Sequence, residues 1–271
     1  MRARRGDGGA PAAPASSAHA RGLGRRVPPL AAGARRACGG GRRGTPVPAP
    51  GPSPVAPAVA VDVAVFTVVH GVLRVLLVRV GRGAFAGKWA LPGGRVRAEE
   101  TLERAARRQL GAQTGVRGIY LEQLYTFGSP GRDPQARVVS VAYFALIPHG
   151  GRFQGLRTPE PYPDVAWWRL ARLPQLAYDH RAVVATALTR LRAKLRYTNL
   201  VYGLLPPHFT LGELQAMYEA ILGRTLDRRN FRKKILSLGL LRRVAGVRRG
   251  AHRPATLYAF RRRQPMMIEI L

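Results

Sequence analysis

Acidic residues and cysteine are scarce in this 271-residue chain, and each shortage limits the classes of protein to which it can belong. Only 14 residues are Asp or Glu against 45 Lys or Arg, so the formal net charge is +31. The single cysteine, Cys38, excludes a disulfide framework and a zinc site built on cysteines. No apolar run reaches the length of a membrane span, because Asp62, His70, Arg74 and Arg79 interrupt the longest candidate. We therefore expect a cytoplasmic protein with no membrane partner.

The excess of positive charge is distributed unevenly along the chain. Residues 1–56 contain 10 basic and 1 acidic residue, whereas residues 192–271 contain 17 and 4, giving net charges of +9 and +13. The last segment is short and regularly patterned, and its charge favours an anionic polymer as a partner. A general bias toward arginine would produce the same charge without any partner, so charge alone does not decide between the two.

Composition and hydrophobic periodicity divide the first part of the chain into a tail and a folded region. Residues 1–56 are rich in Ala, Gly, Pro and Arg without apolar periodicity, which predicts a disordered tail. Two β-branched runs around His70 and Gly71 predict a hairpin. A turn at "GKWALPGG" leads into a helix expected to begin near Glu100 and to end at Gly115. With two further strands downstream, residues 57–173 predict an α+β or sandwich domain.

A second pattern begins after residue 173. Residues 174–195 predict a connecting helix with Asp179 at its cap. Within residues 196–271, "FTLGELQAMYEAILG" opens with a T-x-x-E capping box, and the next helix carries a buried stripe of Phe231, Ile235 and Leu238. A basic hairpin follows. Short helices before a basic β-wing are the parts of a winged helix-turn-helix.

One helical face is the clearest clue to chemistry. Positions 109, 112 and 113 share a face, because residues three and four apart on a helix are neighbours. Carboxylates there would hold hard divalent cations beside a bound pyrophosphate. The chain instead has Gln109, Ala112 and Gln113. We therefore predict no catalytic residue, no metal site and no cofactor.

This face lies inside a sequence that resembles the Nudix box. The box pattern is G-x5-E-x7-R-E-U-x-E-E-x-G-U, and its matching residues here are Gly94, Glu100, Arg108, Leu110, Gly115 and Val116. The three helical glutamates that bind the catalytic metals in Nudix hydrolases are the positions that differ. The resemblance implies a Nudix-like α/β/α sandwich whose hydrolytic chemistry has been lost.

A nucleotide pocket can persist without catalysis. The "RDP" at 132–134 resembles the loop of Nudix proteins that recognise ADP-ribose, and the planar guanidinium of Arg132 would suit a phosphate. Tyr125 and Phe127, on the preceding strand, would stack on an adenine, although aromatic pairs at that spacing are more often part of a core. The predicted ligand-binding residues are Arg108, Tyr125, Phe127, Arg132 and Asp133.

The basic helix after residue 227 provides candidate DNA contacts. Arg229 and Lys233 lie one turn apart, opposite the buried stripe, with Arg232 nearby, and Asn230 projects to the side. The wing adds basic residues around Gly250, suited to the DNA backbone or minor groove. The predicted DNA-binding residues are Arg228, Arg229, Asn230, Arg232, Lys233, Arg248, Arg249 and Arg253. A solvated basic face without a partner is the alternative.

The combination resembles the Nudix-related transcriptional regulators (NrtR), which join a catalytically degenerate Nudix domain to a C-terminal winged helix. The likeness is carried by the altered box, "RDP", "LAYDH", "FTLGELQAMYEAILGR", "LDRRNFRKKIL" and "RPATLY". It covers about residues 58–260. The resemblance implies a dimeric repressor of NAD-metabolism genes whose binding to a double-stranded DNA operator is altered by ADP-ribose, an effector rather than a cofactor.

Two other functions stay open from the sequence. One is an active Nudix hydrolase of ADP-ribose-like nucleoside diphosphates with an unusual metal site. The other is a non-catalytic nucleotide-binding module whose basic tail contacts RNA or acidic proteins. The missing acids at positions 109, 112 and 113 oppose the first, and sequence-specific binding to duplex DNA would oppose the second.

Overall fold

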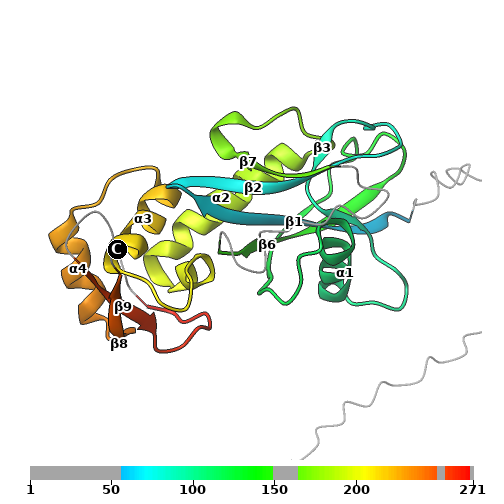
Figure 1. Cartoon of the computed structure of the whole chain (residues 1–271). Coiled ribbons are helices and arrows are strands. Elements are labelled where there is room, and N and C mark those ends of the chain that lie inside the picture. The colour runs from blue at the N-terminus through cyan, green and yellow to red at the C-terminus, as the bar shows by residue number, and fades with distance from the viewer. Residues whose placement is uncertain (1–55, 149–163, 249–253, 269–271) are drawn as a thin grey trace, which may run out of the picture. The chain divides into compact units, whose positions relative to one another are not determined.

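The computed structural model describes residues 56–148, 164–248 and 254–268 (Figure 1). The predicted disordered tail therefore lies outside the described residues, except for its last residue. The same holds for residues 249–253, the expected tip of the basic wing. In the part that is described, none of the helices has the length and apolar character needed to cross a bilayer.

A hairpin begins the folded region, as predicted. Strands β1 (Ala58–Val69) and β2 (Val72–Arg79) pair antiparallel. The turn between them consists of His70 and Gly71, both in the left-handed region with φ of 48° and 73°. Two consecutive residues with positive φ match the right-handed twist of the flanking strands. The predicted hairpin is confirmed.

The main sheet is built around β1. Its strand order is β3-β2-β1-β6-β5, while β4 also pairs with β1 and β7 also pairs with β2. The other strands are β3 (Trp89–Ala90), β4 (Gly93–Arg95), β5 (Glu122–Phe127), β6 (Val138–Leu146) and β7 (Val165–Arg169). The pairing of β1 with β6 is parallel over nine residue pairs. A central strand with both faces covered has an apolar run without alternation, which explains the composition of β1.

Helices cover both faces of this sheet. On one face Val61 and Val63 pack in a cluster with Ala105 and Leu110 of α1 (Leu102–Thr114). On the other face, a cluster that includes Phe66 also contains residues of α2 (His180–Tyr197), among them Val183, Ala187 and Leu191. The predicted α/β/α sandwich is confirmed.

Local signals in the sequence set the ends of α1. The hydroxyl of Thr101 accepts a hydrogen bond from the backbone N–H of Arg104, so Thr101 is the N-cap and the helix begins two residues after the expected Glu100. Gly115 ends it in the left-handed conformation with φ 74°, as expected. The helix therefore presents residues 109 and 113 to the glycine turn of β4.

The C-terminal part has the predicted winged-helix components. It contains a 3-10 segment η3 (Leu200–Leu204), helices α3 (Leu211–Leu222) and α4 (Arg228–Ser237), and the hairpin of β8 (Leu241–Arg248) with β9 (Ala255–Phe260). The capping box is confirmed, with Thr210 and Glu213 each accepting from the other's backbone N–H. Phe231 and Ile235 are buried, whereas Leu238 follows the helix and is partly buried.

Candidate functional site

A cavity of about 400 Å³ opens where the glycine turn of β4, the loop after β5 and the start of α2 meet. Ligand pockets of small molecules begin at roughly this size. The cavity is lined both by apolar strand residues and by polar side chains. Its polar side chains belong to Asp62, Arg82, Arg95, Gln113, Arg132, Asp133, Gln135, Tyr178 and His180.

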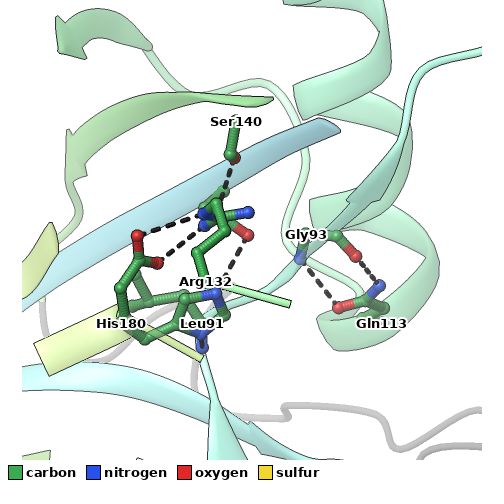
Figure 2. Close-up of polar contacts among 8 residues, drawn as sticks. Leu91, Gly93, Gln113, Arg132, Ser140 and His180 are labelled. Atoms are coloured by element: carbon green, nitrogen blue, oxygen red, sulfur yellow. Dashed lines mark hydrogen bonds and ion pairs between the residues drawn. The ribbon is translucent and has the colours of Figure 1, made fainter. Parts of the chain in front are cut away.

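Asp62, in the middle of β1, is the centre of a buried polar network. Its carboxylate accepts from Nη2 of Arg132 at 3.1 Å and from the hydroxyl of Ser140 at 2.5 Å. His180 places Nε2 3.2 Å from the other oxygen. The Nδ1 of His180 accepts from the N–H of Leu91 at 2.9 Å (Figure 2). The ring proton therefore lies on Nε2, the nitrogen that faces Asp62. Each polar group in this network has a partner, which is what burial requires.

The network determines the ionisation of Asp62. Burial acts to raise its pKa, but the neighbouring His180, the hydroxyl of Ser140 and the charge of Arg132 outweigh burial and lower the pKa to about 2. Asp62 is therefore an anion at neutral pH. Its contacts with Arg132, Ser140 and His180 hold the wall of the cavity together.

Arg132 lines the cavity, as the predicted ligand-binding role requires, but its guanidinium is also bound to protein. Besides Asp62, it donates to both oxygens of Asp179, which precedes α2. Asp179 has the predicted N-cap position but makes no capping hydrogen bond, because its carboxylate is turned toward Arg132. The structure brings Asp133 to the cavity as well. Phosphate binding by Arg132 stays a prediction.

Gln113, one of the three altered box positions, joins α1 to the glycine turn. Its amide nitrogen donates to the carbonyl of Gly93 at 2.6 Å, and its amide oxygen accepts from the N–H of Gly93 at 3.1 Å (Figure 2). The same nitrogen lies 3.1 Å from the side-chain oxygen of Gln109. A carboxylate has no hydrogen to donate. Glutamine thus makes a paired contact that a glutamate at position 113 could not make.

The donors around the box do not fit a divalent metal ion. Gln109 and Gln113 are neutral and bound to each other, and Ala112 has no ligand atom. In the described ranges no three His, Cys, Asp or Glu side chains are grouped to hold a metal ion. Hard cations such as Mg²⁺ are held through carboxylates and water, so we derive no step through a metal.

Arg108, a predicted ligand residue, is hydrogen-bonded to other parts of the protein, and its contact with a ligand stays a prediction. Its Nε donates to Glu100 at 2.8 Å and Nη2 donates to the carbonyl of Arg95 at 3.2 Å. The hydrogen bond from Arg108 lowers the pKa of Glu100 to about 2. Arg108 is not among the residues that line the cavity. It fastens the loop before α1 to the helix.

The structure does not bring Tyr125 and Phe127 to the cavity lining. Their rings form an edge-to-face pair with centroids 5.5 Å apart on β5, at the end of the sheet order. Tyr125 is 60% exposed. Their predicted stacking on an adenine stays a prediction.

Residues that sequence reasoning did not select complete the cavity. Tyr178 lines it with a left-handed backbone, φ 52°, and its ring centroid lies 4.5 Å from that of Phe85 and 5.1 Å from that of His180. A lone aspartate in the apolar run of β1 was the signal for Asp62. Neither Tyr178 nor His180 has a comparable signal apart from the "LAYDH" resemblance.

The second candidate surface is the outer face of α4. Asp227 caps the helix by accepting from the N–H of Asn230 at 2.7 Å. Arg228, Arg229, Asn230 and Lys233 are exposed. Arg232 is partly buried, and its Nε has no hydrogen-bond partner in the described structure. Arginines in the first turn oppose the helix dipole, so an anion at this end would be favourable.

The wing residues are placed only in part. Arg248 donates to a carboxylate oxygen of Glu213 at 2.8 Å and to the carbonyl of His208 at 3.1 Å. It thereby ties β8 to the first turn of α3. Arg249 and Arg253, together with His252, lie outside the described residues.

Comparisons with known proteins identify two consecutive domains in the chain. The family model of the NUDIX domain matches residues 57–187, and that of the NrtR DNA-binding winged helix domain matches residues 201–260. A curated protein of Acinetobacter baylyi, "ADPR responsive transcriptional repressor NtrR", is 38% identical over 206 residues, covering 75% of this chain and 82% of the relative.

Two further similar proteins differ in what their names describe, one a complex with DNA and the other an enzyme. The crystal structure of Shewanella oneidensis NrtR complexed with a 27mer DNA is 35% identical with a TM-score of 0.66, over 75% of this chain and 93% of that one. An ADP-ribose pyrophosphatase of Methanocaldococcus jannaschii is 34% identical over 128 residues, 47% of this chain and 71% of the enzyme.

Proposed function

We propose, from the premise that this chain belongs to the NrtR family of Nudix-related regulators, that it is a DNA-binding transcriptional repressor responsive to ADP-ribose. The main support is the 38% identity to an ADPR responsive repressor over 206 residues. This aligned length is greater than that of either domain match alone. Its targets would be genes of NAD metabolism, as the family resemblance implies.

The basic face of α4 supports the DNA-binding half of this proposal. Arg228, Arg229, Asn230 and Lys233 are exposed on a helix whose opposite side is buried through Phe231 and Ile235. A recognition helix places such residues in the major groove, where Arg and Asn bind base edges and phosphates. Arg248, Arg249 and Arg253 would contact the backbone from the wing.

The cavity beside the box supports the ligand-binding half. It is large enough for a small molecule and combines apolar strand residues with three arginines and Tyr178. ADP-ribose, or a related nucleotide, would present a diphosphate to the arginines and a ring to an aromatic side chain. Arg132 and Asp133 are the predicted ligand residues that line this cavity.

Hydrolysis of ADP-ribose is the second candidate, favoured by the 34% identity to an ADP-ribose pyrophosphatase. We propose that the chain is not an enzyme, because Gln109, Ala112 and Gln113 cannot supply anionic metal ligands and Gln113 is hydrogen-bonded to Gly93. Purified full-length protein with Mg²⁺ should produce no AMP from ADP-ribose above a buffer blank. Sustained metal-dependent turnover would reverse this conclusion.

The test of the regulator is a mobility shift with full-length protein and the promoter next to its own gene. We expect a sequence-specific complex that survives an excess of unrelated duplex DNA and is weakened by ADP-ribose. Equal binding to unrelated DNA, or preference for RNA, would instead support the basic module as a non-specific nucleic-acid contact.

We further propose a homodimer acting in the cytoplasm. A two-fold dimer requires a roughly palindromic operator with half-sites separated by whole helical turns, each about 34 Å. Sedimentation of the protein with operator DNA should give two chains per site. A single chain on a full operator would contradict the dimer.

A further inference from the structure

Two arginines at the cavity, Arg82 and Arg95, are the basis of this inference. Both side chains line the cavity, and both residues are exposed. Among the described residues, neither guanidinium has an ion pair or a hydrogen bond. The third cavity arginine, Arg132, is bound to Asp62 and Asp179. Of the three cavity arginines, Arg82 and Arg95 are therefore the two without a carboxylate partner among the described residues.

Arg95 lies where the altered box faces the cavity. It follows Gly93 and Gly94 on β4, in register with Ala60 of β1. Its carbonyl accepts from Arg108, which holds the backbone and leaves the side chain to the cavity. Gln113, from the face that would carry glutamates in a hydrolase, lines the same space. A cation therefore stands next to the position where a hydrolase would hold its metals.

Arg95 and Tyr178 line the same cavity, and the charge of Arg95 affects the Tyr178 hydroxyl. Burial is the main reason that the pKa of the Tyr178 hydroxyl is raised, and the negative charges of Asp133 and Asp62 raise it further. Arg132 and Arg95 act in the opposite direction. Because Tyr178 and Arg95 line the same cavity, a ligand bound there can contact both side chains.

Arg82 comes to the cavity from a different element, the loop between β2 and β3. A Cβ atom placed on the neighbouring Gly83 would lie 3.7 Å from the side-chain oxygen of Gln135, which lines the same cavity. The loop therefore lies close to the segment that carries Arg132 and Asp133. The backbone of Gly83 is left-handed, φ 88°, which a glycine adopts without strain.

We propose that Arg82 and Arg95 bind the diphosphate of the nucleotide ligand directly and take the place of the metal ions of a Nudix hydrolase. The inference rests on the proposed function, since it concerns the same cavity and the same ligand class, an ester of a nucleoside diphosphate. Two guanidinium groups match the two negative charges of the diphosphate and bind oxygens through paired N–H groups.

Binding of the diphosphate by arginine differs physically from binding through a metal ion. Guanidinium groups neutralise the phosphates but do not generate a hydroxide nucleophile, which a bound metal does by lowering the pKa of water. Recognition by arginine therefore holds the ligand intact. It also makes binding independent of divalent metal and sensitive to ionic strength, because the contributing charges lie at an exposed rim.

The test measures ADP-ribose affinity by calorimetry on the full chain, in EDTA and in Mg²⁺. We expect equal affinities in the two buffers. Arg82→Ala and Arg95→Ala should each weaken binding roughly tenfold, as the loss of one charge-assisted hydrogen bond predicts. Arg104→Ala, an exposed arginine of α1 outside the cavity lining, removes the same charge and should leave affinity unchanged. Inorganic pyrophosphate should compete with ADP-ribose in the wild type and less well in the two cavity variants.

The outcomes separate this inference from the proposed function. Wild-type protein that binds no ADP-ribose overturns both. Wild-type binding that is lost in EDTA, or that matches the affinity of both cavity variants, overturns the arginine assignment alone. Since both side chains are exposed and unpaired in the described residues, a circular dichroism spectrum should confirm that the variants fold.

Discussion

The guanidinium of Arg132 donates to both carboxylate oxygens of Asp179, with Nη2 2.7 Å from Oδ1 and Nε 3.1 Å from Oδ2. The two residues are 47 positions apart, one in the loop after β5 and one at the start of α2. The pair therefore joins the cavity wall to the helix that leads to the winged-helix part. Arg132 is 7% exposed, so its charge depends on these partners.

Replacing Asp179 should destabilise the protein measurably. Asp179→Asn removes a negative charge and one of the two acceptors while leaving Arg132 nearly buried, and we expect a loss of about 1–2 kcal/mol. The measurement is the urea midpoint. The matched control is Asp164→Asn, which breaks the exposed pair with Arg79. That change should cost less than about 1 kcal/mol. Equal effects of the two substitutions would mean that the buried pair has no special role.

Acid should destabilise the protein through Asp62. Its pKa is about 2 in the folded state against an ordinary 3.8, so the stabilisation is complete above pH 4 and is lost as the pH falls through 2. The amount is about 2 kcal/mol. Glu100, whose pKa is also lowered to about 2, adds to the loss in the same range.

The check compares denaturant midpoints between pH 2 and pH 5 for wild type and Asp62→Asn. The variant should be less stable at neutral pH and should show a shallower decline below pH 4, the remaining decline reflecting Glu100 and other carboxylates. A variant with the wild-type slope would show that Asp62 does not supply this dependence.

Restoring one box glutamate should not restore chemistry and should reduce stability. Gln113→Glu removes the donor to the carbonyl of Gly93 and sets a negative charge against that oxygen, at a cost of about 1–3 kcal/mol. Gln123→Glu, on the exposed side of β5, makes the same change in charge and should be nearly neutral. Thermal unfolding measures both. A stable Gln113→Glu variant would contradict the structural role of this amide.

Removing two cations from α4 should weaken operator binding and flatten its salt dependence. For Arg229→Ala combined with Lys233→Ala, we expect a loss of roughly 10- to 100-fold at moderate salt and a logarithmic salt slope smaller by about 2. Fluorescence anisotropy on operator DNA at several salt concentrations measures both quantities. The control, Arg104→Ala with Arg172→Ala, removes two exposed arginines of the Nudix part and should leave the slope unchanged. Equal slopes for the two double variants would place the DNA interface elsewhere.

Periodic and local signals were sufficient for most elements of the fold. The hairpin at His70 and Gly71, the end of α1 at Gly115 and the Thr210–Glu213 capping box depend on neighbouring residues, and each was predicted and confirmed. The absence of acidic residues at positions 109, 112 and 113 could be recognised from the spacing of a helix alone. Such features are visible in the sequence because their physical cause lies within a few residues.

The cavity could not be predicted from the sequence, because its lining residues are brought together only by the tertiary structure. Asp62, Arg132 and His180 come from β1, a loop and α2, up to 118 positions apart (180 minus 62), and their contacts depend on how the sheet and helices pack. Asp179 was correctly placed before α2, but its carboxylate goes to a distant arginine rather than to its own helix. The sequence by itself determined the elements, the missing metal ligands and the basic C-terminal charge. Only the tertiary structure decided which arginines are bound to carboxylates and which face the cavity without a partner among the described residues, because ion pairing depends on distances in space.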